Sequence, residues 1–248
     1  MARETLVMLP GMMCDQRLFA PQIKVFSQGY DIIVPQPSGS ASIEGMARKV
    51  LNETGAQHFN LLGLSMGGIV AMALLRMVPN RISRLALLDT NHLADSPGRF
   101  TVRNRQIADA QAGKLKQLIA EEMKPAYLSK KSRGNRVLLN LLIDMATDLG
   151  PQVFVEQSEA LRDRADYSEA LTKYYGPTLV LCGAEDSLCP PERHREICDL
   201  LPNADLCIIA DAGHISTLEQ PQTVNQALSH WLARPLEIAH HEHATNQH

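Results

Sequence analysis

The chain has 248 residues, 45% of them apolar, so it is long enough to bury one α/β core. Its 24 Lys and Arg residues are set against 27 Asp and Glu residues, which gives a formal net charge of -3. Such a balance offers no global attraction to nucleic acid or to an anionic membrane, and we expect neither as a partner.

Short apolar runs recur along the chain in a pattern typical of strands that are buried on both faces. They cover residues 5–10, 30–35, 59–64, 84–89, 178–183 and 205–210. Helical patterns lie between several of them, at residues 43–54, 66–77, 190–201 and 219–233. The alternation predicts one α/β domain with a mostly parallel sheet, flanking helices and an active site beyond the carboxyl ends of the strands.

The alternation breaks between residues 91 and 175. This segment is helical in pattern, is rich in Lys and Arg, and contains amphipathic stretches at 104–123 and 135–150. We interpret it as a helical cap inserted into the core domain. The segment 236–248 has no apolar period, so we expect a disordered tail, and the spacing of its histidines matches no closed metal site.

The cysteine spacing and the hydropathy pattern indicate the cellular compartment in which the protein is expected. The five cysteines include no C-x-x-C pair, and they suggest neither a disulfide framework nor a thiolate metal site. The apolar run from Leu6 to Leu9 is too short for a signal-peptide core, and no later segment approaches the roughly 18 uninterrupted apolar residues of a membrane helix. We therefore expect a cytoplasmic protein.

The most informative motif is Gly63-Leu64-Ser65-Met66-Gly67, a G-x-S-x-G run between a predicted strand and a predicted helix. At such a junction the serine is held in a sharp, strained turn, and a side chain in place of either glycine would clash with the neighbouring strand or helix. The turn would lift the Ser65 hydroxyl clear of the sheet and next to a helix N-terminus, where a developing oxyanion is stabilised. The alternative for the motif alone is a glycine-rich helix start with a serine cap.

Two later strand ends supply partners for this serine. A serine hydroxyl needs a base near pH 7, and the base needs an acid that fixes its tautomer. Asp186 follows one strand and His214 follows the last strand, so both should lie on the same rim of the sheet as Ser65. Asp89 also ends a strand and remains the alternative acid, whereas the contexts of the other candidate histidines suit a base less well: His58, His92, His194 and His230.

Three motifs together resemble the α/β-hydrolase superfamily. The run "GLSMGG" resembles its nucleophile elbow, "GAEDSLCP" its acid turn and "AGHISTLEQP" its histidine loop, and the resemblance covers nearly all of residues 4–233. Within the superfamily, the chain is most similar to small serine carboxylesterases and enol-lactonases. The family often has two strands before the one at 5–10, so we expect a sheet that is shortened at its N-terminal edge.

The resemblance also implies an oxyanion hole. The family usually has a His-Gly-x loop after its first conserved strand, and here Pro10 takes the place of the histidine while Gly11 is kept. By resemblance, the backbone N–H groups of Met12 and Met66 form the hole, a role that needs no particular side chain.

The expected chemistry is acyl transfer. Ser65 attacks an ester carbonyl, His214 takes the proton, and water hydrolyses the acyl-enzyme with no metal or organic cofactor. We expect a soft apolar substrate pocket to which five residues contribute: Met13, Phe19, Met123, Tyr127 and Met145. Lactone or thioester hydrolysis is an alternative for the same machinery, and a non-catalytic small-molecule receptor is an alternative of another class.

Charge is distributed unevenly within the chain. Residues 99–136 hold ten Lys and Arg residues against three acids. A solvated helical face would explain them. The alternative is a basic cap that steers an anionic ester, an acyl-CoA or an acyl carrier protein toward the pocket.

Overall fold

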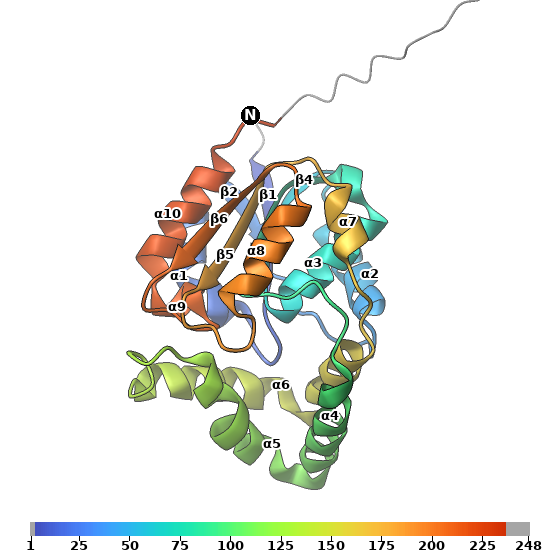
Figure 1. Ribbon diagram of the computed structural model, residues 1–248, viewed down its shortest axis with the longest axis vertical. Helices are drawn as coiled ribbons and strands as arrows, with labels where there is room; N and C mark the ends of the chain where they lie inside the picture. The colour runs from blue at the N-terminus through green and yellow to red at the C-terminus, as the bar shows by residue number, and fades with distance from the viewer. Residues whose placement is uncertain (1–2, 237–248) are drawn as a thin grey trace, which may run out of the picture.

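The computed structural model describes residues 3–236 and contains one sheet (Figure 1). All neighbouring strands are parallel, in the order β2-β1-β3-β4-β5-β6. The strands are β1 (Glu4–Leu9), β2 (Tyr30–Ile33), β3 (Phe59–Leu64), β4 (Ile82–Leu88), β5 (Thr178–Gly183) and β6 (Ala204–Ile209). The predicted parallel sheet is therefore confirmed, with each strand within two residues of its expected bounds. The predicted tail at 236–248 lies, apart from its first residue, outside the described residues.

Helices cover both faces of the sheet (Figure 1). The four helices expected between the strands are present as α2 (Ile43–Thr54), α3 (Met66–Met77), α8 (Pro191–Leu200) and α10 (Pro221–Leu232). Two short helices were not predicted, α1 (Ala20–Phe26) and α9 (Ser216–Glu219). Each spans two turns or fewer, which is too short for an apolar period to stand out in the sequence.

Side chains alternate between two cores because successive residues of a strand point to opposite faces. Val7 and Leu9 of β1 pack on the side of α2, α3 and α8, while Leu6 and Met8 pack on the side of α1 and α10. The last helix covers its side with Trp231, which is fully buried and donates a hydrogen bond to the Pro177 carbonyl. The sheet is thus buried on both faces, as its apolar runs predict.

The chain between β4 and β5 forms most of a separate helical layer (Figure 1). This layer contains α4 (Pro97–Asp109), α5 (Leu115–Gln117) and α6 (Arg136–Arg162), joined by irregular helical turns. It lies beyond the carboxyl ends of the strands, where Figure 1 shows it below the sheet. The last helix of the segment, α7 (Ser168–Thr172), instead packs beside α3 and α8.

Helix α6 is long and apolar enough to cross a membrane by length and composition alone. However, Gly150 has φ 80° and ψ 175°, and Pro151 follows it, so the helix is divided in two. Each part is shorter than the roughly 20 residues that span a bilayer. The Gly-Pro break instead lets α6 turn over the end of the sheet and contribute residues to both cores.

Candidate active site

Ser65 lies in a strained turn between β3 and α3. Its backbone has φ 55° and ψ -118°, a conformation that non-glycine residues rarely adopt. The Ser65 N–H donates to the Leu88 carbonyl at the end of β4, and its carbonyl accepts from the Thr90 hydroxyl at 2.7 Å. These contacts hold the turn so that the hydroxyl of Ser65 borders a cavity between the sheet and the cap.

The two glycines of the motif are required by backbone packing. A Cβ on Gly63 would lie 2.3 Å from the Gly67 carbonyl oxygen, and a Cβ on Gly67 would lie 2.0 Å from the Leu9 carbonyl oxygen. Both obstacles are main-chain atoms that cannot rotate away. The close approach of strand, helix and β1 loop is therefore possible only with glycine at both positions.

His214 joins Ser65 to Asp186. Its Nε2 lies 2.8 Å from the Ser65 Oγ, and its Nδ1 lies 2.8 Å from Asp186 Oδ2. The other carboxylate oxygen of Asp186 accepts from the N–H groups of Leu188 and Cys189, at 2.9 Å each. The side chains named from the sequence thus form a continuous serine–histidine–aspartate relay of hydrogen bonds.

The environment favours the protonated imidazole. Burial alone would lower the pKa of His214, but the charge and hydrogen bond of Asp186, together with the charge of Asp89, raise it above its ordinary value. The edge of the ring also packs against Tyr127, at 5.0 Å between centroids and 77° between planes. A histidine in this setting readily accepts a proton from a neighbouring hydroxyl.

Asp89, the alternative acid, lies beneath this relay and has other partners. It accepts hydrogen bonds from the Gly183 N–H at 2.9 Å and from the Ser216 hydroxyl and N–H at 2.7 and 3.2 Å. Burial, followed by the charge of Asp186, raises the pKa of Asp89 to about 7. Its carboxylate ties the ends of β4, β5 and the histidine loop together, but it forms no hydrogen bond to His214.

The backbone N–H groups expected to form the oxyanion hole are available. Met66 is the first residue of α3, so its N–H has no partner within the helix. No other hydrogen bond engages the N–H of Met66 or of Met12 among the described residues. Both residues border the same cavity as Ser65 and His214. An oxyanion formed beside Ser65 would find two unused donors there.

Two residues missed by the sequence analysis hold the loop that carries Met12. The Lys124 ammonium is fully buried and lies 3.3 Å from the carbonyl oxygens of Met12 and Met13. Gln157 of α6 accepts from the Met13 N–H at 2.8 Å, and Met13 has φ 52°. In the sequence, Lys124 belongs to a basic, amphipathic stretch whose lysines are typical of a solvent-exposed helix face. Its buried contacts are therefore visible only in the folded structure.

The cavity has a volume of about 600 Å³ and lies between the rim of the sheet and the cap. Of the residues expected to bind substrate, Met123 and Tyr127 line it. Met13, Phe19 and Met145 do not, and the prediction for these three is corrected: they are fully buried packing residues of the two cores. An unexpected part of the lining is polar, with several arginines.

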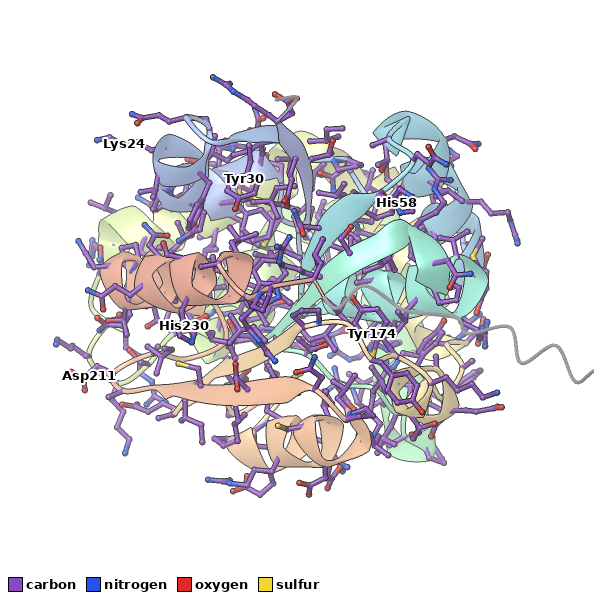
Figure 2. The ribbon with its side chains drawn as sticks, turned by 90° about the horizontal axis from the view of Figure 1, so that it is seen from above. Lys24, Tyr30, His58, Tyr174, Asp211 and His230 are labelled. Atoms are coloured by element: carbon purple, nitrogen blue, oxygen red, sulfur yellow. The ribbon has the colours of Figure 1, made fainter. Side chains whose placement is uncertain are left out.

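The rival histidines lie elsewhere. His58 and His230 are exposed, and Figure 2 shows them on different elements, before β3 and on α10. His194 is buried, accepts from the Thr90 N–H at 2.9 Å, and has its pKa lowered to about 4 by burial. His92 is also buried, and burial lowers its pKa. Among the described histidines, His214 alone is hydrogen-bonded to Ser65.

Asp186, Cys189 and His214 also offer potential metal-ligand atoms within 4.8 Å of one another. The facing atoms of Asp186 and His214 already bond to each other. Burial, reinforced by the charges of Asp186 and Asp89, raises the pKa of the Cys189 thiol well above its usual value, whereas a metal ligand must be a thiolate. This donor set fits a hydrogen-bonded acid and base better than a metal site.

Comparison with known proteins identifies the family of the fold. Residues 37–221 match the family model for the alpha/beta hydrolase fold. The putative carbamate hydrolase RutD of Yersinia enterocolitica is 25% identical, over 99% of this chain and 93% of its own. A thermophilic esterase from Thermogutta terrifontis, solved with malate bound, superposes with a TM-score of 0.82 at 28% identity, over 93% of this chain and 90% of its own. The enol-lactonase of Burkholderia xenovorans has a TM-score of 0.84 at 23% identity, over 94% and 93% of the two chains, which shows a shared fold. The chain belongs to the α/β-hydrolase fold family.

Proposed function

We propose that this protein is a serine hydrolase that cleaves carboxylic esters through an acyl-enzyme. The observation that carries the proposal is the contact of His214 Nε2 with the Ser65 Oγ, 2.8 Å apart beside a cavity. A binding protein has no physical need for a serine in a strained turn that is hydrogen-bonded to a histidine–aspartate pair. The esterase among the structural relatives adds support.

The mechanism follows from the contacts. His214 accepts the Ser65 proton as Oγ attacks the carbonyl carbon, and Asp186 stabilises the imidazolium that forms. The N–H groups of Met12 and Met66 bind the oxyanion. His214 then gives the proton to the leaving alcohol. Water, activated by the same imidazole, attacks the acyl-enzyme and restores Ser65.

The same steps would open a lactone or cleave a thioester, so both remain candidate substrates. The cap also has four exposed bases that form no ion pair among the described residues: Lys116, Lys130, Arg133 and Arg136. We propose that they could dock an acyl-CoA or an acyl carrier protein. We also propose a cytoplasmic location. All five cysteines are free thiols, which is typical of proteins in a reducing compartment.

The test is hydrolysis of p-nitrophenyl acetate and butyrate by the purified protein without added metal. Ser65→Ala should lower kcat by about 10⁴-fold or more, since the members of such a triad act as a unit. A fluorophosphonate should label Ser65 in the wild type. Ser96→Ala is the matched control, because Ser96 lines the cavity without a histidine partner and should keep both turnover and labelling. Turnover that survives in Ser65→Ala would refute the proposal, and a wild type inactive on a broad ester panel would favour a receptor.

A further inference from the structure

Three arginines gather around one carboxylate in the wall of the cavity. Asp95 lies on the segment that connects β4 to α4, and its side chain is only 5% exposed. Arg103 Nε lies 2.5 Å from one Asp95 oxygen, and Arg164 Nη1 and Arg99 Nε lie 3.2 and 3.8 Å from the other. All four residues line the cavity that contains Ser65 and His214.

The charges of this cluster do not balance. The other charged residues of the lining have partners of their own: Glu122 accepts from Arg105 at 2.6 Å, and Arg193 pairs with Glu196 at 2.5 Å. One carboxylate therefore faces three guanidinium groups, which leaves an excess of two positive charges. Arg99 is half-exposed, but Arg103 and Arg164 are both buried, so the cluster contains one buried cation more than Asp95 can neutralise. An unneutralised buried charge costs free energy, which a further anion would offset.

Arg103 has unused hydrogen-bond donors. Its side chain is 7% exposed, and its only hydrogen bond to a described residue is the one from Nε to Asp95. Both Nη groups therefore lack a protein acceptor within the described part of the chain. Arg164 is more constrained, because it also donates to the Leu93 and Leu161 carbonyls, at 2.8 and 2.9 Å. A buried guanidinium with two free donors at a cavity wall is suited to bidentate recognition of a carboxylate.

We propose that this arginine cluster binds a carboxylate of the substrate, so that the preferred ester carries a free carboxylate in addition to its scissile bond. The proposal rests on the proposed esterase function and names its substrate class. Arg103 receives the carboxylate, Arg99 and Arg164 add positive charge, and Asp95 holds the three guanidinium groups together when the site is empty. Because Ser65 borders the same cavity of about 600 Å³, a substrate that fills this cavity contacts both sites.

The test compares two esters of equal chain length, the mono-p-nitrophenyl ester of glutaric acid and p-nitrophenyl valerate. The wild type should have at least tenfold higher kcat/KM for the glutarate ester after subtraction of the uncatalysed rate. Arg103→Met should reduce this preference by ten- to a hundredfold, because the charged hydrogen bonds are lost. Arg48→Met is the control, since Arg48 is exposed on α2, does not line the cavity and forms no ion pair with a described residue. It should leave the preference unchanged.

Equal kcat/KM for the two esters in the wild type would overturn the proposal, as would equal effects of Arg103→Met and Arg48→Met on the preference. If Arg103→Met does not fold, Arg99→Gln tests the same point at a side chain that is half-exposed. It should lower the preference several-fold.

A binding measurement separates this proposal from the esterase function. Free glutarate should bind the Ser65→Ala protein in calorimetry, and Arg103→Met should weaken this binding at least tenfold, while uncharged glutaramide should not bind measurably. If the wild type hydrolyses no ester but glutarate binds in this Arg103-dependent way, the esterase function fails and the carboxylate site stands. If neutral esters are hydrolysed but glutarate does not bind, the carboxylate site fails alone.

Discussion

Asp186→Asn tests the assignment of the acid most sharply, because the contacts of Asp186 fix how the new amide must lie. One oxygen of Asp186 accepts two backbone hydrogen bonds, from Leu188 and Cys189 at 2.9 Å each. An asparagine keeps both only if its carbonyl oxygen occupies that position. Its NH₂ group must then face Nδ1 of His214, where Asp186 now accepts at 2.8 Å.

This orientation of the amide would force the imidazole of His214 into its other tautomer. Facing a donor, Nδ1 must become the acceptor, and the ring proton moves to Nε2, which faces the Ser65 hydroxyl. His214 could then no longer accept the serine proton, and its cation would lose its counter-charge. For the equivalent exchange in a serine protease the loss in kcat is about 10⁴-fold, and we expect a similar loss here.

The pH profile gives a second readout. His214 must be neutral to act as a base, so kcat/KM of the wild type should fall as the pH drops through the pKa of His214, which lies above its ordinary value of 6.5. Removing the charge of Asp186 should lower this pKa. The acid limb of the residual activity should therefore move to lower pH in Asp186→Asn.

Asp89→Asn is the control for this experiment. Asp89 bonds to Gly183 and Ser216 and not to His214, so the variant should retain activity within about tenfold. An asparagine leaves at least one of the three donors that face Asp89 unpaired, which should cost about 1–3 kcal/mol in the free energy of unfolding. Urea denaturation separates this loss from the loss of kcat. An active Asp186→Asn beside an inactive, folded Asp89→Asn would move the acid to β4.

Two further predictions concern the cap. Lys124→Met should lower kcat by about ten- to a hundredfold on any ester. The loop that carries Met12 would lose the ammonium that lies 3.3 Å from two of its carbonyl oxygens, and a small displacement of the proposed oxyanion donor slows the reaction. Lys116→Met, at an exposed lysine, is the control, and circular dichroism checks that both variants fold. An unchanged kcat in folded Lys124→Met would contradict the proposed role of Lys124 in positioning this loop. If the cap surface steers anionic substrates, kcat/KM for an acyl-CoA should fall steeply between low salt and about 0.5 M salt. At the higher concentration the Debye length is only a few Å, so the attraction between the cap and a distant anion is screened. Replacing Lys130, Lys131 and Arg133 by Glu should reproduce that fall at low salt, and equal salt responses of an acyl-CoA and a neutral ester would contradict it.

The sheet and the hydrogen-bonded Ser65, His214 and Asp186 could be predicted because their sequence signals are local. Each strand of a parallel sheet is a continuous apolar run, and functional residues follow such runs at the same rim, as Ser65, Asp186 and His214 do. The glycine signal is also local, since Gly63 and Gly67 lie two residues from Ser65, although the main-chain atom that excludes a side chain at Gly67 belongs to Leu9 of β1. The unpredicted helix α1 has only seven residues, too few to show a period.

The cavity wall could not be predicted because its contacts join distant parts of the chain. Lys124 lies 112 residues from Met12, and Gln157 lies 144 residues from Met13. An amphipathic pattern shows that a helix has a buried face, but not what that face contacts. For the same reason, Met13, Phe19 and Met145 resembled pocket residues in the sequence, although the structure places them in the cores.

These distant contacts join the cap to the proposed catalytic residues. The backbone carbonyl of Tyr127 accepts a hydrogen bond from the backbone N–H of His214 at 2.8 Å. The adjoining Gly213 has no room for a side chain, because a Cβ would lie 2.5 Å from the same carbonyl oxygen. Lys124 contacts the loop that carries Met12 and lies 4.4 Å from the centre of the Tyr127 ring, against which His214 also packs. One short cap segment therefore contacts both the loop that carries His214 and the loop that carries Met12. Arg99, Arg103 and Arg164, which line the cavity, also belong to the segment between β4 and β5. Changes in substrate preference and changes in kcat should therefore be coupled through this segment.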